Sequence, residues 1–359
     1  MLPSNLRDEL RWRAIGLTRT LAGRRVARSE WEALSAWRGL VHQAYQSEPL
    51  QANLTSHLWH QGRFQDPQAR RAFFTPNRRE REPSSHHYGH DLQLKRFVGL
   101  PLIGAPLQVL LEHGLKVART SRFESPKPWA QKGFFCMGPL RARWIENDFQ
   151  VPAQAIGPWI RFAKPLLSAM QIARQKKEWG KTLLVVLAHS WDQVERSMDL
   201  SHCVEAVEAI VKKENYQKVV WLRHWKDPED IPLRDGWIKA CNGHRSNPWF
   251  LDSMRTLLEL SDGLASNAFG THLGYAAALG TKLHWIDVDV EQKLDHLSAE
   301  KAKEEQAEWD ERQRLSLALR SCLTLPEPKQ AQSIHDLFDP YWGLSVAANP
   351  EDLARHLER

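Results

Sequence analysis

The sequence is poor in cysteine and has no long apolar run, and both absences narrow the class of protein. Its 359 residues include four cysteines, which lie far apart and form no C-x-x-C pair. Neither a disulfide framework nor a cysteine-rich zinc site is therefore indicated. The longest apolar stretch, residues 97–111, is interrupted by glycines and prolines, and it is shorter than the roughly 20 residues that a membrane-spanning helix needs. No signal peptide is readable either, so we expect a cytoplasmic protein.

Lysine is absent from the first 81 residues, whereas arginine is abundant there. This segment holds 14 arginines against 7 acidic residues, a net charge of +7, while the whole chain carries +6. Such a segment attracts anionic surfaces, including the inner face of a membrane. The alternative is a solvated helical face whose arginines pair with nearby acidic side chains. We expect residues 1–83 to form an α-helical basic preface and connector, with peripheral contact to the inner membrane face under the first interpretation.

From residue 84 onwards the pattern is that of an α/β protein. Short apolar runs punctuated by glycine and proline predict a compact α/β unit over residues 84–164. Further on, four predicted strands alternate with helices, at 183–188, 218–222, 263–266 and 283–286. Strands separated by helices of this length are typical of βαβ units and a buried parallel sheet. We therefore predict a second, Rossmann-like unit over residues 165–359, which includes a long polar helix at 299–323 and a terminal helix at 349–358.

The strongest local signal is the run S-N-A-F-G-T-H-L-G-Y at 266–275, between a predicted strand and a predicted helix. A glycine-containing turn that opens a helix presents free backbone N–H groups and the positive end of the helix dipole, which together favour a phosphate. Gly270 would let the ligand approach the backbone, and Ser266, Asn267 and Thr271 would add donors. The alternative is an ordinary threonine N-cap, because the run is neither a Walker loop nor G-x-G-x-x-G.

A second candidate follows the buried strand that ends at Leu187. His189 and Ser190 occupy the equivalent strand end of the first βαβ unit, so they would face the same crevice. His189 could donate to a phosphate or assist a leaving group; the alternative is a hydrogen-bonded loop histidine. Trp159 and Trp191 flank this crevice in the sequence-based arrangement. Their flat faces suit sugar rings, although packing in the core is the alternative for each.

Several of these motifs together resemble a known family. The motifs are G-P-W-I at 157–160, the strand followed by H-S at 189–190, the run at 266–275, D-P-Y-W-G at 339–343 and N-P-E-D-L at 349–353. They resemble bacterial GT-B glycosyltransferases of surface-polysaccharide assembly, in the sialyltransferase-like and Kdo-transferase-like branch that builds lipopolysaccharide or capsule. The resemblance covers residues 86–358. It implies an α/β fold with two Rossmann-like domains facing a cleft, with acceptor domain 84–164 and nucleotide-sugar domain 165–359.

The resemblance also implies roles for particular residues. The donor would be a nucleotide sugar, CMP-linked or carried on a diphosphate, and the acceptor a glycan or lipid-linked glycan. The implied donor-binding residues are His189, Ser190, Ser266, Asn267, Gly270, Thr271, His272, Tyr275, Gly157 and Trp159. The implied catalytic candidates are Glu112, His90, Asp91 and His113. One of them would serve as base if the anomeric configuration inverts, and Asp91 or Glu112 as nucleophile if it is retained.

Three alternatives stay open. The string Asp287-Val288-Asp289 follows a predicted strand and could hold a divalent metal, but we favour an acidic loop and expect no metal and no cofactor. A sequence pI of about 9.1 is typical of proteins that bind nucleic acids, so nucleic-acid binding is an alternative function. No known RNA- or DNA-binding motif supports it, so we expect no nucleic-acid partner. A catalytically silent nucleotide-sugar binding protein is the remaining alternative, because fold alone does not prove chemistry.

Overall fold

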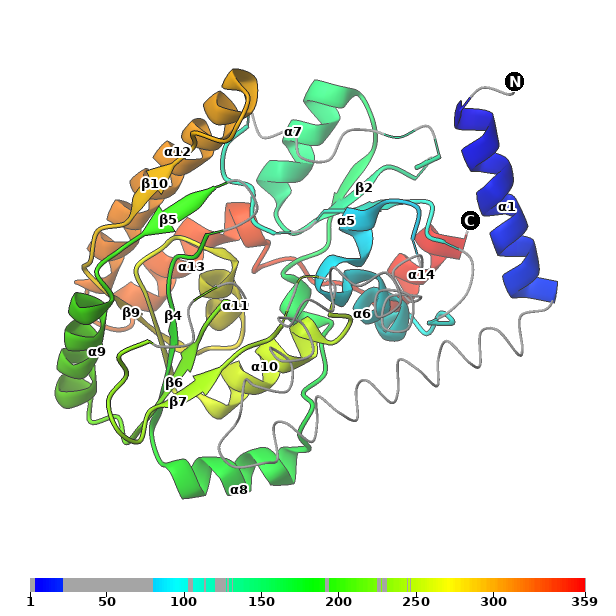
Figure 1. Cartoon of the computed structure of the whole chain (residues 1–359). Helices are drawn as coiled ribbons and strands as arrows, with labels where there is room; N and C mark the ends of the chain where they lie inside the picture. The colour runs from blue at the N-terminus through cyan, green and yellow to red at the C-terminus, as the bar shows by residue number, and fades with distance from the viewer. Residues whose placement is uncertain are drawn as a thin grey trace.

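The architecture consists of two parallel sheets with helices packed around them (Figure 1). It was obtained as a computed structural model. The structure describes residues 4–21, 80–102, 106–112, 114–119, 127, 129–130, 132–190, 194–224, 227, 231–243, 245 and 247–358. The predicted α/β class, with a Rossmann-like second unit, is confirmed. Of the predicted basic preface, residues 22–79 lie outside the described residues.

The first unit is a small three-stranded parallel sheet with short helices. Its strands are β1 (Leu110–Leu111), β2 (Phe134–Cys136) and β3 (Ala153–Ala155), in the order β1-β2-β3. Its helical segments are α5 (Pro83–His86), η2 (His87–Gly89), α6 (His90–Phe97), α7 (Pro139–Phe149) and η3 (Trp159–Arg161). Helix α1 (Ser4–Leu21) precedes this unit and is tied to it by an ion pair between Glu9 and Arg81 with an N···O distance of 2.6 Å.

The second unit is a five-stranded parallel sheet whose central strand is the first one along the chain. The strands are β4 (Thr182–Val186), β6 (Lys218–Leu222), β7 (Ile238–Ala240), β8 (Gly263–Ser266) and β9 (Lys282–Trp285), in the spatial order β7-β6-β4-β8-β9. The chain therefore builds outward on one side of β4 and then returns to build on the other. Such a reversal leaves a crevice outside the carboxyl ends of β4 and β8, where open α/β sheets bind ligands.

Helices cover both faces of this sheet, and all five residues of β4 are buried between them. The helices are α8 (Ala169–Trp179), α9 (Leu200–Glu214), α10 (Phe250–Leu260), α11 (Thr271–Ala278), α12 (Ala299–Leu323), α13 (Lys329–Trp342) and α14 (Pro350–Glu358). A short antiparallel pair, β5 (Glu195–Ser197) with β10 (Glu291–Lys293), lies beside α12 (Figure 1). Helix α9 is capped by Asp199, whose carboxylate accepts from the backbone N–H groups of Ser201 and His202.

The hydrophobic core is shared between the two units. One continuous cluster of buried side chains runs from Phe135 and Trp159 in the first unit to Leu184 and Leu264 in the second. The terminal helix α14, which the sequence places with the second unit, packs against the first (Figure 1). There the Lys132 ammonium donates to the Leu357 carbonyl at 2.8 Å, so the end of the chain completes the first unit. None of the helices in the described ranges has the length and apolarity needed to cross a bilayer.

Candidate functional site

A cavity of about 340 Å³ lies between the two units, at the carboxyl ends of both parallel sheets. Residues 114–116, which follow β1, form part of its wall on the side of the first unit. On the other side, the walls come from the segments that follow β4, β6, β7 and β8, and from one face of α12. The cavity thus includes the crevice between β4 and β8 that the strand order creates. Its volume lies at the lower end of the range typical of small-molecule sites.

The turn that opens α11 forms one wall of this cavity. Of the predicted donor-binding residues in this turn and helix, five line the cavity: Asn267, Gly270, Thr271, His272 and Tyr275. Gly270 is the N-cap of α11, and the first N–H groups of a helix have no partner within it. The Asn267 side chain accepts from the backbone N–H of Ala188 at 2.9 Å and so joins the ends of β4 and β8. The helix N-terminus therefore faces an enclosed space in which an anion would be favoured.

Three histidines, two from loops and one from the first turn of α11, lie beside this turn. His189, after β4, stacks on His224, after β6, with ring centroids 4.2 Å apart. His272 shares a hydrogen bond of 2.8 Å with the Ser266 hydroxyl. Burial, with a smaller contribution from Arg196, lowers the pKa of His189 to about 4. Burial, together with His189 and Arg312, lowers the pKa of His272 to about 3. Both imidazoles are therefore neutral hydrogen-bonding groups at pH 7.

Two arginines that the sequence analysis missed supply positive charge. Arg312, on α12, donates to the carbonyls of Phe269 and Leu115 and pairs with Glu308 at 2.8 Å. Arg196, on β5, lies over the Trp309 ring with its guanidinium carbon 5.1 Å from the centroid. Burial and the neighbouring Arg312 lower the pKa of Arg196 to about 10, so it stays protonated near neutral pH. Two partly buried guanidinium groups close enough to repel each other would be stabilised by a bound anion.

The cavity also contains two carboxylates, both on α12. Glu308 is buried and accepts hydrogen bonds from the backbone N–H groups of Val117 and Ala118 at 3.0 and 2.9 Å, in addition to its pair with Arg312. It therefore fastens α12 to the first unit. Glu305 lies one turn earlier on the same face of the helix and also lines the cavity. Burial raises the pKa of the Glu305 carboxyl above its ordinary value.

None of the described catalytic candidates from the sequence is among the residues that line the cavity. Glu112 pairs with Arg141 at 2.5 Å, and each side chain is only 4% exposed. His90 stacks on Trp159 with ring centroids 4.2 Å apart, and Asp91 is fully buried in α6. Glu112 and His90 are therefore engaged in buried contacts within the first unit. His113 lies outside the described residues.

Four predicted donor-binding residues are not among those that line the cavity. Trp159 is completely buried and donates from its indole to the Glu112 carbonyl at 3.0 Å. Gly157 has φ +83° and packs close to the backbone of Gly343. Ser266 is buried, and the Ser190 hydroxyl accepts from the backbone N–H of Arg196 on β5. Trp191 lies outside the described residues.

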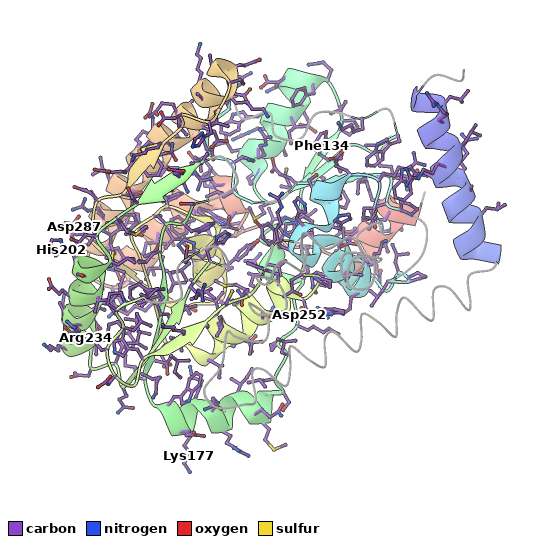
Figure 2. The ribbon with its side chains drawn as sticks, in the orientation of Figure 1. Phe134, Lys177, His202, Arg234, Asp252 and Asp287 are labelled. Carbon is purple, nitrogen blue, oxygen red and sulfur yellow. The ribbon has the colours of Figure 1, made fainter. Side chains whose placement is uncertain are left out.

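The Asp287 carboxylate lies away from the cavity, at the outer edge of the second unit (Figure 2). It pairs with Arg320 at 2.8 Å and is 71% exposed. Asp289 is also exposed. Within the described ranges, no group of three or more histidine, cysteine, aspartate or glutamate side chains is arranged to hold a metal ion. The string at 287–289 is therefore part of an exposed loop in which one carboxylate has an arginine partner.

Stability is expected to fall as the pH drops from 6.5 towards 4, because buried histidines must then be protonated on unfolding. The pKa values of His189, His272 and His284 lie at about 4, 3 and 4 in the folded chain, against about 6.5 when unfolded. The unfolded chain therefore binds more protons across this range, and the contribution is fully present above pH 6.5. Urea unfolding at pH 7.5, 6 and 5 measures this contribution to the free energy of unfolding. His272→Gln should make the dependence shallower, and an unchanged slope would contradict the assignment.

Comparisons with known proteins were made for the sequence and for the structure. No protein-family model and no curated protein matches the chain. Among solved structures, the chain is similar to that of Phytolacca americana UGT2 complexed with UDP-2fluoro-glucose and pterostilbene, at 12% sequence identity and a TM-score of 0.28. The match covers 64% of this chain and spans half the length of that one. Because identity and TM-score are both low, the chemistry of the cavity is derived below from its own residues.

Proposed function

We propose that this chain is a glycosyltransferase that moves a sugar from a nucleotide-sugar donor to a hydroxyl group of an acceptor. The observation that carries the proposal is the meeting of the α11 N-terminus with Arg196 and Arg312 in a cavity between two parallel sheets. The donor phosphate would bind at residues 270–272. There the backbone N–H groups and the two guanidinium groups would stabilise the charge that develops on the leaving phosphate.

The composition of the cavity wall supports a ligand with both charge and rings. Among the described residues that line it, the basic side chains outnumber the carboxylates: Lys116, Arg196, Arg223, Arg245 and Arg312 against Glu305 and Glu308. The excess of positive charge matches a phosphorylated ligand. Tyr88 and Phe250 form an aromatic part of the wall, with ring centroids 4.7 Å apart. Aromatic faces of this kind pack against sugar rings and nucleobases, and binding both substrates in one cavity supplies proximity.

The finer assignment rests on the sequence resemblance. The motifs at 157–160, 266–275 and 339–343 support a role in bacterial surface-polysaccharide assembly, with a glycan or lipid-linked glycan as acceptor and a CMP-linked or diphosphate-linked donor. Helix α1 supports contact with a membrane face. Its Leu6, Leu10 and Leu17 are between 45% and 62% exposed and lie within about 40° of each other around the helix. Exposed arginines are neighbours of this stripe. Flotation with phosphatidylglycerol vesicles, compared with phosphatidylcholine vesicles, tests this contact.

A thermal-shift screen with CMP, UDP, GDP and ADP tests the proposed function. A ligand that binds the folded state stabilises it by about 2.7 kcal/mol at one hundred times its Kd, so one nucleotide should raise Tm clearly above the others. Donor sugars of that nucleotide should then be hydrolysed slowly without acceptor. A silent binding protein would show the shift without hydrolysis. A nucleic-acid binding protein would instead retain RNA or DNA on a filter, with an affinity that falls steeply as salt rises.

A further inference from the structure

We propose that Glu305 is the catalytic base of this cavity and takes the proton from the acceptor hydroxyl during transfer. The inference rests on the proposed function and assigns its missing base, because none of the described base candidates from the sequence, Glu112, His90 and Asp91, lines the cavity. It also assigns the base to α12 of the second unit, whereas the sequence analysis places it in the first.

The position of Glu305 on α12 is the first support. Residues at i, i+3 and i+7 share one face of a helix, and the positions 305, 308 and 312 have this spacing. All three side chains line the cavity. Glu305 therefore lies on the same wall as Arg312, which we assign to the donor phosphate. A hydroxyl bound beside that phosphate would be within the space that Glu305 borders.

The second support is that Glu305 and Glu308 are the carboxylates among the described cavity-lining residues, and Glu308 is already engaged. Glu308 accepts from two backbone N–H groups and pairs with Arg312, so protonating it would release the tether between α12 and the first unit. Glu305 makes no hydrogen bond and no ion pair within the described part of the chain. A carboxylate without such partners can accept a proton from a ligand without losing a contact that stabilises the fold.

The third support is a comparison with the histidines. His189 and His272 have pKa values of about 4 and 3, which makes them weak bases. Burial raises the pKa of the Glu305 carboxyl above its ordinary value, with Glu308 raising it further and Lys116, Arg196 and Arg312 opposing the rise. A base becomes more effective as its pKa rises towards the working pH. Burial therefore strengthens Glu305 as a proton acceptor, whereas it weakens both histidines.

We propose that the transfer is a single displacement at the anomeric carbon of the donor sugar. The acceptor oxygen forms a bond to the anomeric carbon of the donor sugar, and the bond from that carbon to the phosphate oxygen breaks. The electron pair of the broken bond stays on the phosphate, which is stabilised by the α11 N-terminus, Arg196 and Arg312. The acceptor proton passes to a Glu305 carboxylate oxygen and is released to water afterwards. A direct displacement of this kind inverts the anomeric configuration.

Glu305→Gln tests the assignment, with Glu304→Gln as the matched control on the same helix outside the cavity lining. The probes are UDP-glucose, UDP-N-acetylglucosamine, GDP-mannose, ADP-glucose and CMP-sialic acid, with water as acceptor and nucleotide release as the readout. Removal of a general base lowers rates by about 10² to 10⁴-fold. We expect a loss of at least about 100-fold in kcat for Glu305→Gln, and an unchanged rate for Glu304→Gln.

Three further measurements separate a base from a structural residue. The Kd of the parent nucleotide should be unchanged or lower in Glu305→Gln, because a negative charge near the phosphate is removed. The acidic limb of the kcat/KM profile should disappear in this variant, and formate should partly restore the rate of Glu305→Ala. If the wild-type protein turns over a donor and Glu305→Gln is equally active, this inference is overturned and the proposed function stands. Nucleotide binding without turnover of any donor, or no binding at all, would overturn both.

Discussion

Gly270→Asp is expected to weaken nucleotide binding at least about 100-fold while leaving the fold intact. Gly270 is the N-cap of α11 and has extended backbone angles, φ −131° and ψ 171°, which any residue can adopt. Aspartate is a favoured N-cap residue and would itself cap the free N–H groups of the first turn. Its carboxylate would occupy the place proposed for the donor phosphate and repel it. Isothermal titration with the nucleotide selected by the thermal-shift screen measures the loss.

Gly270→Ser is the matched control for this substitution. Any side chain at position 270 meets the His272 ring, because a Cβ would lie 2.7 Å from its Cε1. Serine introduces the same Cβ and a hydrogen-bonding cap without the charge, so it separates displacement of His272 from electrostatic exclusion of phosphate. We expect serine to weaken binding much less than aspartate, with both variants melting at or above the wild-type temperature. Equal, full-strength binding by Gly270→Asp would remove residues 270–272 as the phosphate site.

Gly274→Ala is expected to destabilise the chain by about 2 kcal/mol, although a glycine-to-alanine change inside a helix normally stabilises by about 1 kcal/mol. Gly274 lies in α11 against α13, and a Cβ there would be 2.2 Å from three atoms of the Trp342 indole. Trp342 is completely buried and cannot move freely. Overpacking therefore outweighs helix propensity. Urea unfolding measures the change in the free energy of unfolding.

Gly274→Ala should also weaken nucleotide binding in the cavity. The Trp342 indole donates to the Thr271 carbonyl at 3.3 Å, at the start of α11. Pushing the indole away would disturb the turn that we assign to the phosphate, so nucleotide affinity should fall together with stability. Trp342→Phe, which makes room beside Gly274, should recover part of the stability in the double variant. A Gly274→Ala variant more stable than wild type would show that the two helices can separate without loss.

The sequence could predict the elements whose pattern is local. Residues 218–222 and 263–266 form strands as predicted, because apolar runs buried on both faces are recognisable alone. The polar helix at 299–323 has the predicted bounds. Helix α13 was not predicted, and its Pro340 favours a break, because a proline inside a helix removes a backbone hydrogen bond.

The candidate site could be predicted where it follows from strand ends, and not where it depends on the packing of a distant helix. The turn at 266–272 and His189 border one cavity because the carboxyl ends of adjacent parallel strands meet. Arg312 and Glu305 lie on a helix that is charged over much of its surface, so no pattern distinguishes its cavity face from its solvent face. Glu112 was selected through the family resemblance, but Arg141, 29 residues later, holds its carboxylate in a buried pair.

The packing of α14 on the first unit has a consequence for biosynthesis. Leu353 on this helix is 2% exposed, and the His356 ring lies 5.1 Å from the ring of Phe135, on the central strand of the small sheet. Domains usually fold from the N-terminus as the ribosome delivers them. Here the surface around Phe135 is covered only by residues that are translated more than 200 positions later. The small sheet is therefore expected to mature only after α14 has been synthesised and has left the ribosome, and truncations near residue 349 should accumulate as insoluble protein.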